Sequence, residues 1–198
     1  MFCKKRRVIE ALQAVDLKPP ESFIDIFPHQ LSGGQRQRVA IAAALVLKPK
    51  FLIADEPVSM LDASVSTDIL NLIINIKRDF ELTYLFITHD LAIARQIGDR
   101  IAVLYLGKIM EIGEAQEITD NPLNPYTKAL VSVVPVPDNK REKIILKGEI
   151  PNSFNIEHGC KFQTRCFISQ QKCRVDEPIL REIRSGHFSA CHFAEQLI

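Results

Sequence analysis

Apolar positions recur at helical spacing over the first quarter of the chain. Residues 4–17 repeat them every three or four positions and stop at two prolines, which predicts an amphipathic helix. Residues 35–47 predict a second helix. Its second half, 40–47, is apolar on all sides, so we expect that half to be buried.

Two short apolar runs follow, and each ends in polar residues. Residues 51–54 and 84–87 have the length and composition of buried parallel strands, with a helical pattern over 66–80 between them. A helix over 91–97 and a hairpin over 101–112 come next. This order predicts an α/β fold, with a mostly parallel sheet and flanking helices.

The character of the sequence changes after residue 113. Residues 119–138 are rich in proline and asparagine, with a short helix predicted over 126–133, and the remainder carries cysteines without clear periodicity. We therefore expect an α/β part over 1–113 and a small, irregular, cysteine-containing C-terminal extension over 114–198.

Composition narrows the classes of function. The 198 residues are 46% hydrophobic and 25% charged, with a net charge of +1, which is ordinary for a globular protein and gives no strong field for nucleic acid. The longest apolar stretch, 39–47, is far shorter than the roughly 20 residues that span a bilayer. No secretion signal opens the chain. We expect a cytosolic protein whose membrane contact is made through a partner.

Four of the five cysteines lie within the last quarter of the chain: Cys160, Cys166, Cys173 and Cys191. In a reducing compartment such a cluster favours metal binding. The intervening 5, 6 and 17 residues match neither a zinc finger nor a ferredoxin, so one [4Fe–4S] cluster, zinc, disulfides and free thiols all stay open. Since four thiols suffice, the nearby histidines are expected to be packing or surface residues: His158, His187 and His192.

The run Leu31-Ser32-Gly33-Gly34-Gln35 opens the second predicted helix. A helix N-terminus presents free backbone N–H groups and a partial positive charge, so this turn is suited to hold a phosphate.

Two polar pairs, Asp55-Glu56 and His89-Asp90, stand at the C-terminal ends of the two predicted strands. That edge of an open α/β sheet is where ligands bind. One carboxylate can hold Mg²⁺, an adjacent one can activate water, and a histidine can contact a γ-phosphate. The chemistry suits phosphate hydrolysis.

Together these motifs resemble the ATP-binding subunit of an ATP-binding cassette (ABC) transporter. Residues 31–35 resemble the LSGGQ signature, and 51–56 resemble Walker B with the catalytic glutamate. Residues 59–62 resemble the D-loop, with Met60 in place of the usual alanine, and 88–90 resemble the loop of the switch histidine. All four occur in the order and spacing of the family.

The resemblance implies a role for each motif. The signature residues Ser32, Gly33, Gly34 and Gln35 would contact the γ-phosphate of ATP held by the opposite subunit. Asp55 would position Mg²⁺, and Glu56 would polarise the hydrolytic water. Asp62 would help couple the two sites across the dimer, and His89 would contact the γ-phosphate.

One part of the family pattern is missing. No Gly-x-x-x-x-Gly-Lys-Ser/Thr run occurs, so the phosphate-binding P-loop (Walker A) is absent. The chain is therefore expected to correspond to the C-terminal portion of such a subunit: 1–48 the end of the helical subdomain, and 49–113 the core with Walker B, D-loop and switch loop. Without the P-loop, we expect the chain alone neither to bind nor to hydrolyse ATP appreciably.

The extension resembles the C-terminal element of oligopeptide, dipeptide and nickel importers, through 124–130 and the residues around the cysteines. Asn124 stands where histidine is frequent. Some members of the peptide group carry an iron–sulfur cluster there, which would place a [4Fe–4S] cluster on the four cysteines.

The resemblance implies an ATPase coupled to peptide import, with ATP and Mg²⁺ as cofactors. Its partners would be a second ATP-binding subunit in a head-to-tail homo- or heterodimer, the permease subunits and, indirectly, an extracytoplasmic peptide-binding protein. Its place would be the cytoplasmic face of the cell membrane. Two alternatives stay open: a non-catalytic module that binds the permease or the dimer partner, and a truncated product without function.

Overall fold

A computed structural model describes residues 2–134, 142–149 and 158–198. They form two compact units, Met1–His89 and Asp90–Ile198, which we call the N-terminal and C-terminal units and describe separately. The boundary that the sequence predicts after residue 113 separates two segments of the family pattern. The compact units divide at a different place and do not test it, so that boundary stays a prediction.

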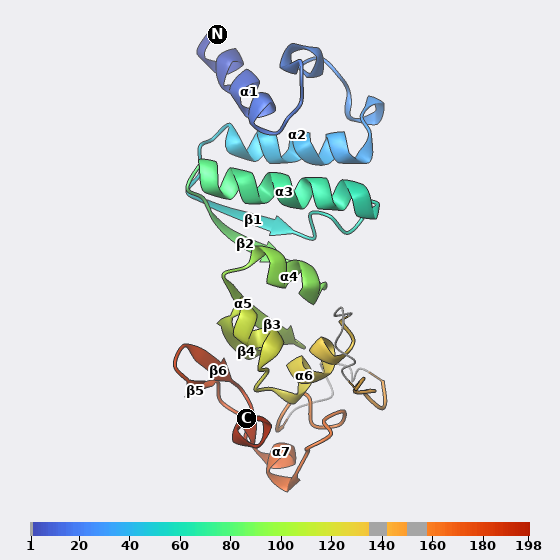
Figure 1. The fold of residues 1–198 in the computed structure, drawn as a ribbon, viewed down its shortest axis with the longest axis vertical. Helices are drawn as coiled ribbons and strands as arrows, with labels where there is room; N and C mark the ends of the chain where they lie inside the picture. The colour runs from blue at the N-terminus through green and yellow to red at the C-terminus, as the bar shows by residue number, and fades with distance from the viewer. Residues whose placement is uncertain (1, 135–141, 150–157) are drawn as a thin grey trace. The chain divides into compact units, whose positions relative to one another are not determined.

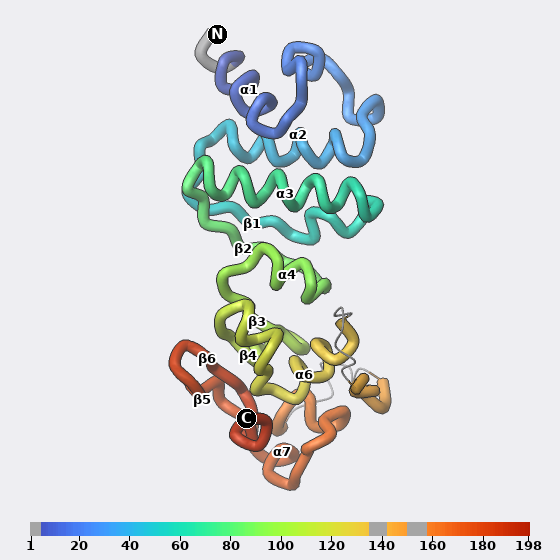
Figure 2. Tube along the Cα trace, viewed as in Figure 1, coloured from blue at the N-terminus to red at the C-terminus, as the bar shows by residue number. Residues whose placement is uncertain are grey.

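The N-terminal unit is built of helices and one pair of strands (Figure 1). Its elements are, in chain order, α1 (Phe2–Ala14), the short helices η1 (Pro20–Phe23) and η2 (Pro28–Gln30), α2 (Gly33–Leu45), β1 (Phe51–Asp55), α3 (Ala63–Asp79) and β2 (Thr83–Ile87). The chain leaves α1 and passes through η1 and η2 before it enters α2, as Figure 2 shows. Helix α2 then packs against both α1 and α3.

Strands β1 and β2 pair in parallel, with Phe51 opposite Thr83 and Asp55 opposite Ile87. Both strands therefore end at one edge, as the sequence predicts. Helix α3 connects them and turns a stripe of isoleucine and leucine into the core: Ile69, Leu70, Leu72, Ile73 and Ile76. This stripe has the spacing of one helix face, which is why the helical pattern was visible in the sequence.

One face of this strand pair is exposed, which the sequence did not predict. Phe51 and Ile53 are 52% and 62% exposed, and Leu85 and Ile87 are 48% and 43% exposed. The alternate residues of each strand are half-buried. The apolar composition typical of a strand buried on both faces thus belongs here to a strand covered on one face.

The prediction that the second half of α2 is buried on all sides was wrong. Ala42 and Leu45 are buried, whereas Leu47, just beyond the helix, is 82% exposed. A helix that is apolar all round needs neighbours on every side. In this unit, the neighbours of α2 are α1 and α3.

The C-terminal unit is built around a four-stranded antiparallel sheet of order β3-β4-β6-β5. Its elements are α4 (Leu91–Ile97), β3 (Arg100–Tyr105), β4 (Lys108–Glu114), α5 (Ala115–Asp120), α6 (Pro125–Ser132), α7 (Gln171–Val175), β5 (Arg181–Arg184), β6 (His187–Ser189) and the short helix η4 (Ala194–Leu197). The predicted hairpin is confirmed as β3 and β4, with Gly107 at φ +76° in its turn.

The extension is less irregular than predicted. Residues 158–170 contain neither helix nor strand, but β5 and β6 form a hairpin whose second strand pairs with β4. Strand β5 reads Arg-Glu-Ile-Arg, so charged residues conceal its period of two.

A buried polar pair joins β4 to β6. Nε2 of His187 lies 2.7 Å from Oε1 of Glu111, which also accepts the backbone N–H of Leu123 at 2.6 Å. Both side chains are almost fully buried, and burial raises the pKa of the Glu111 carboxyl. Gly113 leaves room for the ring, since a Cβ there would lie 3.1 Å from Cδ2 of His187.

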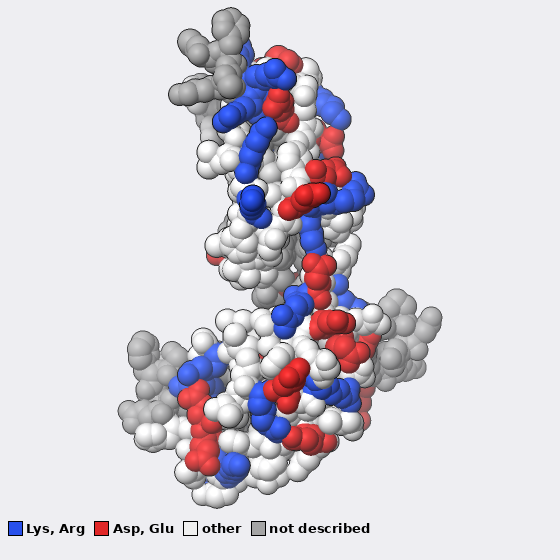
Figure 3. Space-filling model, turned by 90° about the vertical axis from the view of Figure 1, so that its left-hand side faces the viewer, with Lys and Arg blue, Asp and Glu red and all other residues white. Residues whose placement is uncertain are grey.

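The surface carries both signs of charge. Figure 3 shows basic and acidic side chains interspersed on the face that it draws, in keeping with a net charge of +1. On α1, for example, Nε of Arg6 lies 2.9 Å from Oε1 of Glu10. Over the residues that the structure describes, no helix combines the length and the apolar character needed to cross a bilayer.

Candidate functional site

The signature turn is closed by a reciprocal pair of side-chain hydrogen bonds. Ser32 is the N-cap of α2, and its Oγ accepts the backbone N–H of Gln35 at 3.2 Å. In return, Oε1 of Gln35 accepts the backbone N–H of Ser32 at 3.0 Å. This capping box fixes the first turn of α2. The spacing of serine and glutamine typical of this box is visible in the sequence, but only a ligand role was predicted for the two residues.

The two glycines supply the free donors of this turn. The first N–H groups of a helix have no intrahelical partner, and those of Gly33 and Gly34 find none within the described residues. Together with the Ser32 hydroxyl, they are suited to bind an anion.

The carboxyl edge of the parallel strands brings Glu56 and His89 together. Nδ1 of His89 lies 2.7 Å from Oε1 of Glu56, and the same oxygen accepts the His89 backbone N–H at 3.1 Å. The backbone N–H of Glu56 donates to Ile87 O at 3.0 Å, which continues the strand pairing by one residue. The contact between carboxylate and imidazole follows from the shared edge that the sequence predicts.

Glu56 has an unusual backbone for a side chain of its size. Its φ is +47°, in the left-handed region, where residues other than glycine are uncommon and cluster at functional sites. Asp55, one residue earlier, ends β1 and is exposed. The adjacent carboxylates thus stand at the strand end, with Glu56 directed to His89.

Asp62 is the N-cap of α3. Its Oδ1 accepts the backbone N–H of Val65 at 2.9 Å and the Ser64 hydroxyl at 2.7 Å, and these hydrogen bonds lower the pKa of the Asp62 carboxyl. This cap was not predicted, although aspartate just before a helical pattern is its usual signal. Met60, in the same loop, is 98% exposed.

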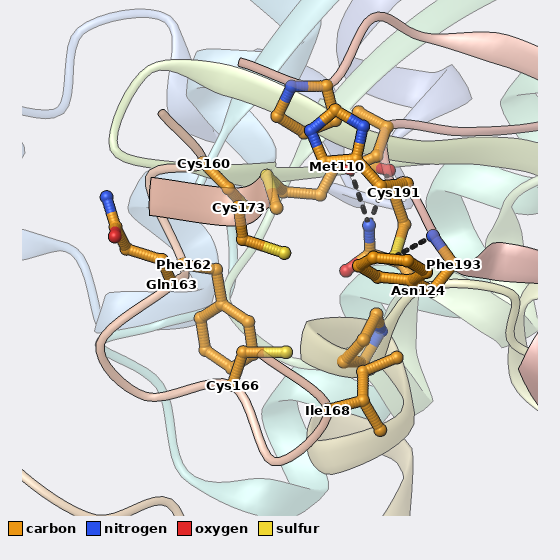
Figure 4. A pocket seen from close by; sticks show the side chains of 14 residues that line it. Met110, Asn124, Cys160, Phe162, Gln163, Cys166, Ile168, Cys173, Cys191 and Phe193 are labelled. Atoms are coloured by element: carbon orange, nitrogen blue, oxygen red, sulfur yellow. Dashed lines mark hydrogen bonds between the residues drawn. The ribbon is translucent and has the colours of Figure 1, made fainter. Parts of the chain in front are cut away.

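A second candidate site lies in the C-terminal unit, where all four clustered cysteines line one pocket (Figure 4). The pocket has about 320 Å³ of empty space, its open mouth included. Its wall also includes Met110, Phe162 and Asn124. The thiols of Cys166 and Cys173 point into the space, and all four cysteines are free of disulfides.

Two residues hold this pocket in shape. Gly159 has a φ of +76°, and a Cβ there would lie 2.4 Å from Cys173 O, so only glycine allows the neighbouring Cys160 to donate its N–H to that oxygen at 2.8 Å. Asn124 is buried and donates from Nδ2 to Met110 O at 3.0 Å and to Ala190 O at 3.3 Å. The amide of Asn124 thereby links β4 to the residue before Cys191.

Burial favours the protonated form of three of these thiols, those of Cys160, Cys166 and Cys191. It raises the pKa of Cys160, that of Cys166 to about 12 and that of Cys191 to about 11. Across the described parts of the chain, no three His, Cys, Asp or Glu side chains are grouped so that they could hold a metal ion. The thiols thus share a pocket without the close tetrahedral arrangement of a zinc site.

Comparison with known proteins identifies the family. Residues 3–59 match the ABC transporter family, and residues 110–173 match the family described as the oligopeptide/dipeptide transporter C-terminal region. This chain belongs to the ABC transporter family. Its matched segments belong to the ABC ATPase domain and to the C-terminal region of oligopeptide/dipeptide transporters, and the sequence contains no Walker A run.

Named relatives agree with this assignment. The chain is 49% identical to the oligopeptide transport ATP-binding protein AppF of Bacillus subtilis, over 96% of this chain and 58% of AppF. It is 48% identical to a putative peptide import ATP-binding protein of Brucella ovis, over 93% of this chain and 58% of that protein. This chain thus spans somewhat under three fifths of the length of these two curated relatives.

A solved structure supports the fold. An ATP-binding cassette of an ABC transporter, crystallised in its ADP conformation, matches with a TM-score of 0.56 at 27% identity. The match covers 64% of this chain and 49% of that one. The predicted fold class, a partial ABC-type ATPase domain, is therefore confirmed. Its described strands form one parallel pair and one four-stranded antiparallel sheet, where a mostly parallel sheet was expected.

Proposed function

We propose that this chain acts in an ATP-driven peptide importer, as the part of an ATP-binding subunit that closes the nucleotide site of a partner. The single observation that supports this most strongly is the contact between Glu56 and His89, 2.7 Å apart at the carboxyl edge of the parallel strands. A carboxylate and an imidazole at that edge are the groups that water activation and γ-phosphate contact require.

In this proposal each polar residue at the strand edge has a separate role in ATP hydrolysis. Asp55 positions Mg²⁺, which neutralises charge on the phosphates when it is bound. Glu56 accepts a proton from the hydrolytic water or orients it, and His89 contacts the γ-phosphate. His89 also holds the Glu56 carboxylate through its ring and its backbone N–H.

The signature turn serves ATP held by the facing subunit. Ser32, Gly33, Gly34 and Gln35 offer a hydroxyl, two unpaired backbone N–H groups and the Gln35 amide at the N-terminus of α2. The sequence contains no P-loop, so the triphosphate must be held by another polypeptide segment. Asp62, at the start of α3, couples the two sites across the head-to-tail dimer.

Complementation of a defective partner tests this division of labour. The partner is a P-loop-bearing ATP-binding subunit of the same family, with its own signature serine replaced by arginine so that its homodimer is inactive. Adding this chain is expected to restore ATP turnover, and Ser32→Arg in this chain is expected to abolish the restoration. A complex that forms without turnover contradicts the proposal.

For the remaining partners, we propose permease subunits and, indirectly, an extracytoplasmic peptide-binding protein, with the chain at the cytoplasmic face of the membrane. The names of the relatives support peptides as cargo. The alternative is a non-catalytic module that binds the permease or the dimer partner. Co-purification with permease subunits, combined with no effect on partner turnover, would favour the module.

We further propose that Cys160, Cys166, Cys173 and Cys191 hold one [4Fe–4S] cluster, since all four line one pocket, although their side chains are not grouped there to hold a single metal ion. Iron and acid-labile sulfide in anaerobically prepared protein test this. Cys173→Ser is expected to remove both, and Cys3→Ser, at the cysteine that lies far from the other four in the sequence, serves as the control. One equivalent of zinc without iron contradicts the cluster.

A further inference from the structure

The two glycines of the signature turn differ in what surrounds them. A Cβ placed on Gly34 would lie 2.7 Å from Cγ1 of Val65, the third residue of α3. On Gly33, the nearest neighbour of a Cβ would be Cδ2 of Leu61, at 3.2 Å. The first distance is shorter than real Cβ contacts, while the second requires a shift of a few tenths of an ångström.

The two neighbours also differ in their freedom to move. Val65 is β-branched and sits in a helix, so its χ1 angle is restricted and Cγ1 cannot easily turn away. Cδ2 of Leu61 is the far end of a longer side chain in a loop, and it can yield. The volume beside Gly34 is thus occupied by a rigid group, and that beside Gly33 by an adaptable one.

Val65 is also bonded to the D-loop. Its backbone N–H donates to Oδ1 of Asp62 at 2.9 Å, and the same oxygen accepts the Ser64 hydroxyl at 2.7 Å. A continuous series of contacts therefore runs from the Asp62 carboxylate through Val65 to Gly34, where α2 and α3 pack together.

We propose that Val65 is a positioning residue that fixes the signature turn against the D-loop, and that residue 34 is glycine because Val65 occupies the space of its Cβ. If a phosphate came close to the turn, both Gly33 and Gly34 would have to lack a side chain. Packing against Val65 requires a glycine at position 34 only. The catalytic consequence rests on the proposed function, whereas the packing claim stands without it.

Unfolding of the chain by itself tests the packing claim. Gly33→Ala and Gly34→Ala are made in the natural background and in Val65→Ala, and thermal midpoints are compared within each background. Alanine favours a helix over glycine, so Gly33→Ala should leave the midpoint unchanged or raise it in both. Gly34→Ala should lower the midpoint with Val65 present and leave it unchanged or raised with Val65→Ala. An equal effect of Gly34→Ala in both backgrounds overturns the proposal.

Turnover of the signature-defective partner tests the positioning role. With this chain added, Gly34→Ala should reduce restored turnover on the order of tenfold or more, because small displacements of contact groups are costly. Gly34→Ala combined with Val65→Ala should recover most of it. If the double variant stays as inactive as Gly34→Ala, the glycine is needed at the phosphate itself and the positioning role is wrong.

The two arms separate the two proposals. If the chain without substitutions restores no turnover, the proposed function fails, and the midpoints alone decide the packing claim. A second outcome is that the chain without substitutions restores turnover while Gly34→Ala lowers neither the thermal midpoint nor the turnover more than Gly33→Ala does. In that case the inference about Val65 fails and the proposed function stands.

Discussion

The two units of this chain hold their polar side chains in different ways. In the N-terminal unit, Ser32 and Asp62 bond to backbone three residues away, at the starts of two helices. In the C-terminal unit, Glu111 meets His187 across 76 residues of sequence, and Ser189 donates to Leu123 O across 66. The signature turn and D-loop are thus organised locally, whereas the cysteine-bearing extension is fastened by long-range contacts.

The difference extends to the sheets. The strand pair of the N-terminal unit leaves Ile53 and its neighbours exposed on one face, while β4 of the C-terminal unit lies inside a four-stranded sheet with a fully buried Glu111. An isolated pair of strands is marginal in water, so the N-terminal unit depends on the helical stripe of α3. The motif-bearing unit is therefore ordered by local contacts, and its strand pair is covered on one face.

The largest effect is expected at the buried pair. Glu111→Ala leaves His187 buried without its partner, and the free energy of unfolding should fall by about 3–5 kcal/mol. Glu114→Ala, an exposed glutamate on the same strand, is the matched control and should change little. Urea unfolding followed by circular dichroism measures both. Equal, small losses would mean that the long-range contact does not hold the extension.

Two isoleucines of the N-terminal unit sharpen the contrast between its faces. Ile73 is 2% exposed on α3, and Ile73→Ala should cost about 2–5 kcal/mol in unfolding free energy. Ile53 is 62% exposed, and Ile53→Ala should stay within about 0.5 kcal/mol. A large loss from Ile53→Ala would show that the exposed face is covered in solution, and sedimentation would reveal whether another copy covers it.

A smaller effect is expected at the signature cap. Ser32→Ala removes the acceptor for the Gln35 N–H and should cost about 1 kcal/mol of stability, whereas Ser32→Asp keeps a good N-cap and should cost less. Thermal unfolding compares the two variants. The same two variants in the turnover assay separate capping from anion contact, because aspartate caps the helix but repels a phosphate. Equal stability of both variants would show that the capping box contributes nothing.

The smallest effect is expected at the exposed pair of Arg181 and Glu195. The guanidinium hydrogen bond lowers the pKa of Glu195 from 4.5 to about 2. Because the folded value is the lower one, the contribution is present above pH 4.5 and is lost as the pH falls toward 2. The midpoint difference between the natural chain and Glu195→Gln should shrink over that window. A midpoint difference that is independent of pH would contradict the lowered pKa of Glu195. Glu149→Gln, at another exposed glutamate, is the control.

What the sequence could predict follows the same division. The meeting of Glu56 and His89 was foreseeable, because two parallel strands with polar ends share an edge. The capping box of Ser32 was equally visible in its spacing, though only the ligand role was predicted. No spacing rule links Glu111 to His187, since they are 76 positions apart and charged residues conceal the periodicity of β5, the strand that lies between them.

The exposed faces were not predictable for a different reason. Apolar composition indicates that a surface is suited to burial, and it does not say what covers it. Ile53 and Leu47 therefore looked like core residues in the sequence, although they are 62% and 82% exposed in the structure. Sequence periodicity gives the buried side of α3 correctly because that helix packs within its own unit.

In the proposed function, this chain offers a signature turn and a hydrolytic edge to ATP that another segment holds. Equilibrium binding of a fluorescent ATP analogue with Mg²⁺, to the purified chain alone and then with the signature-defective partner, tests it most directly. We expect no saturable binding to the chain alone and binding once the partner is present. Saturable binding to the chain alone, at the affinity of an intact subunit, would contradict it.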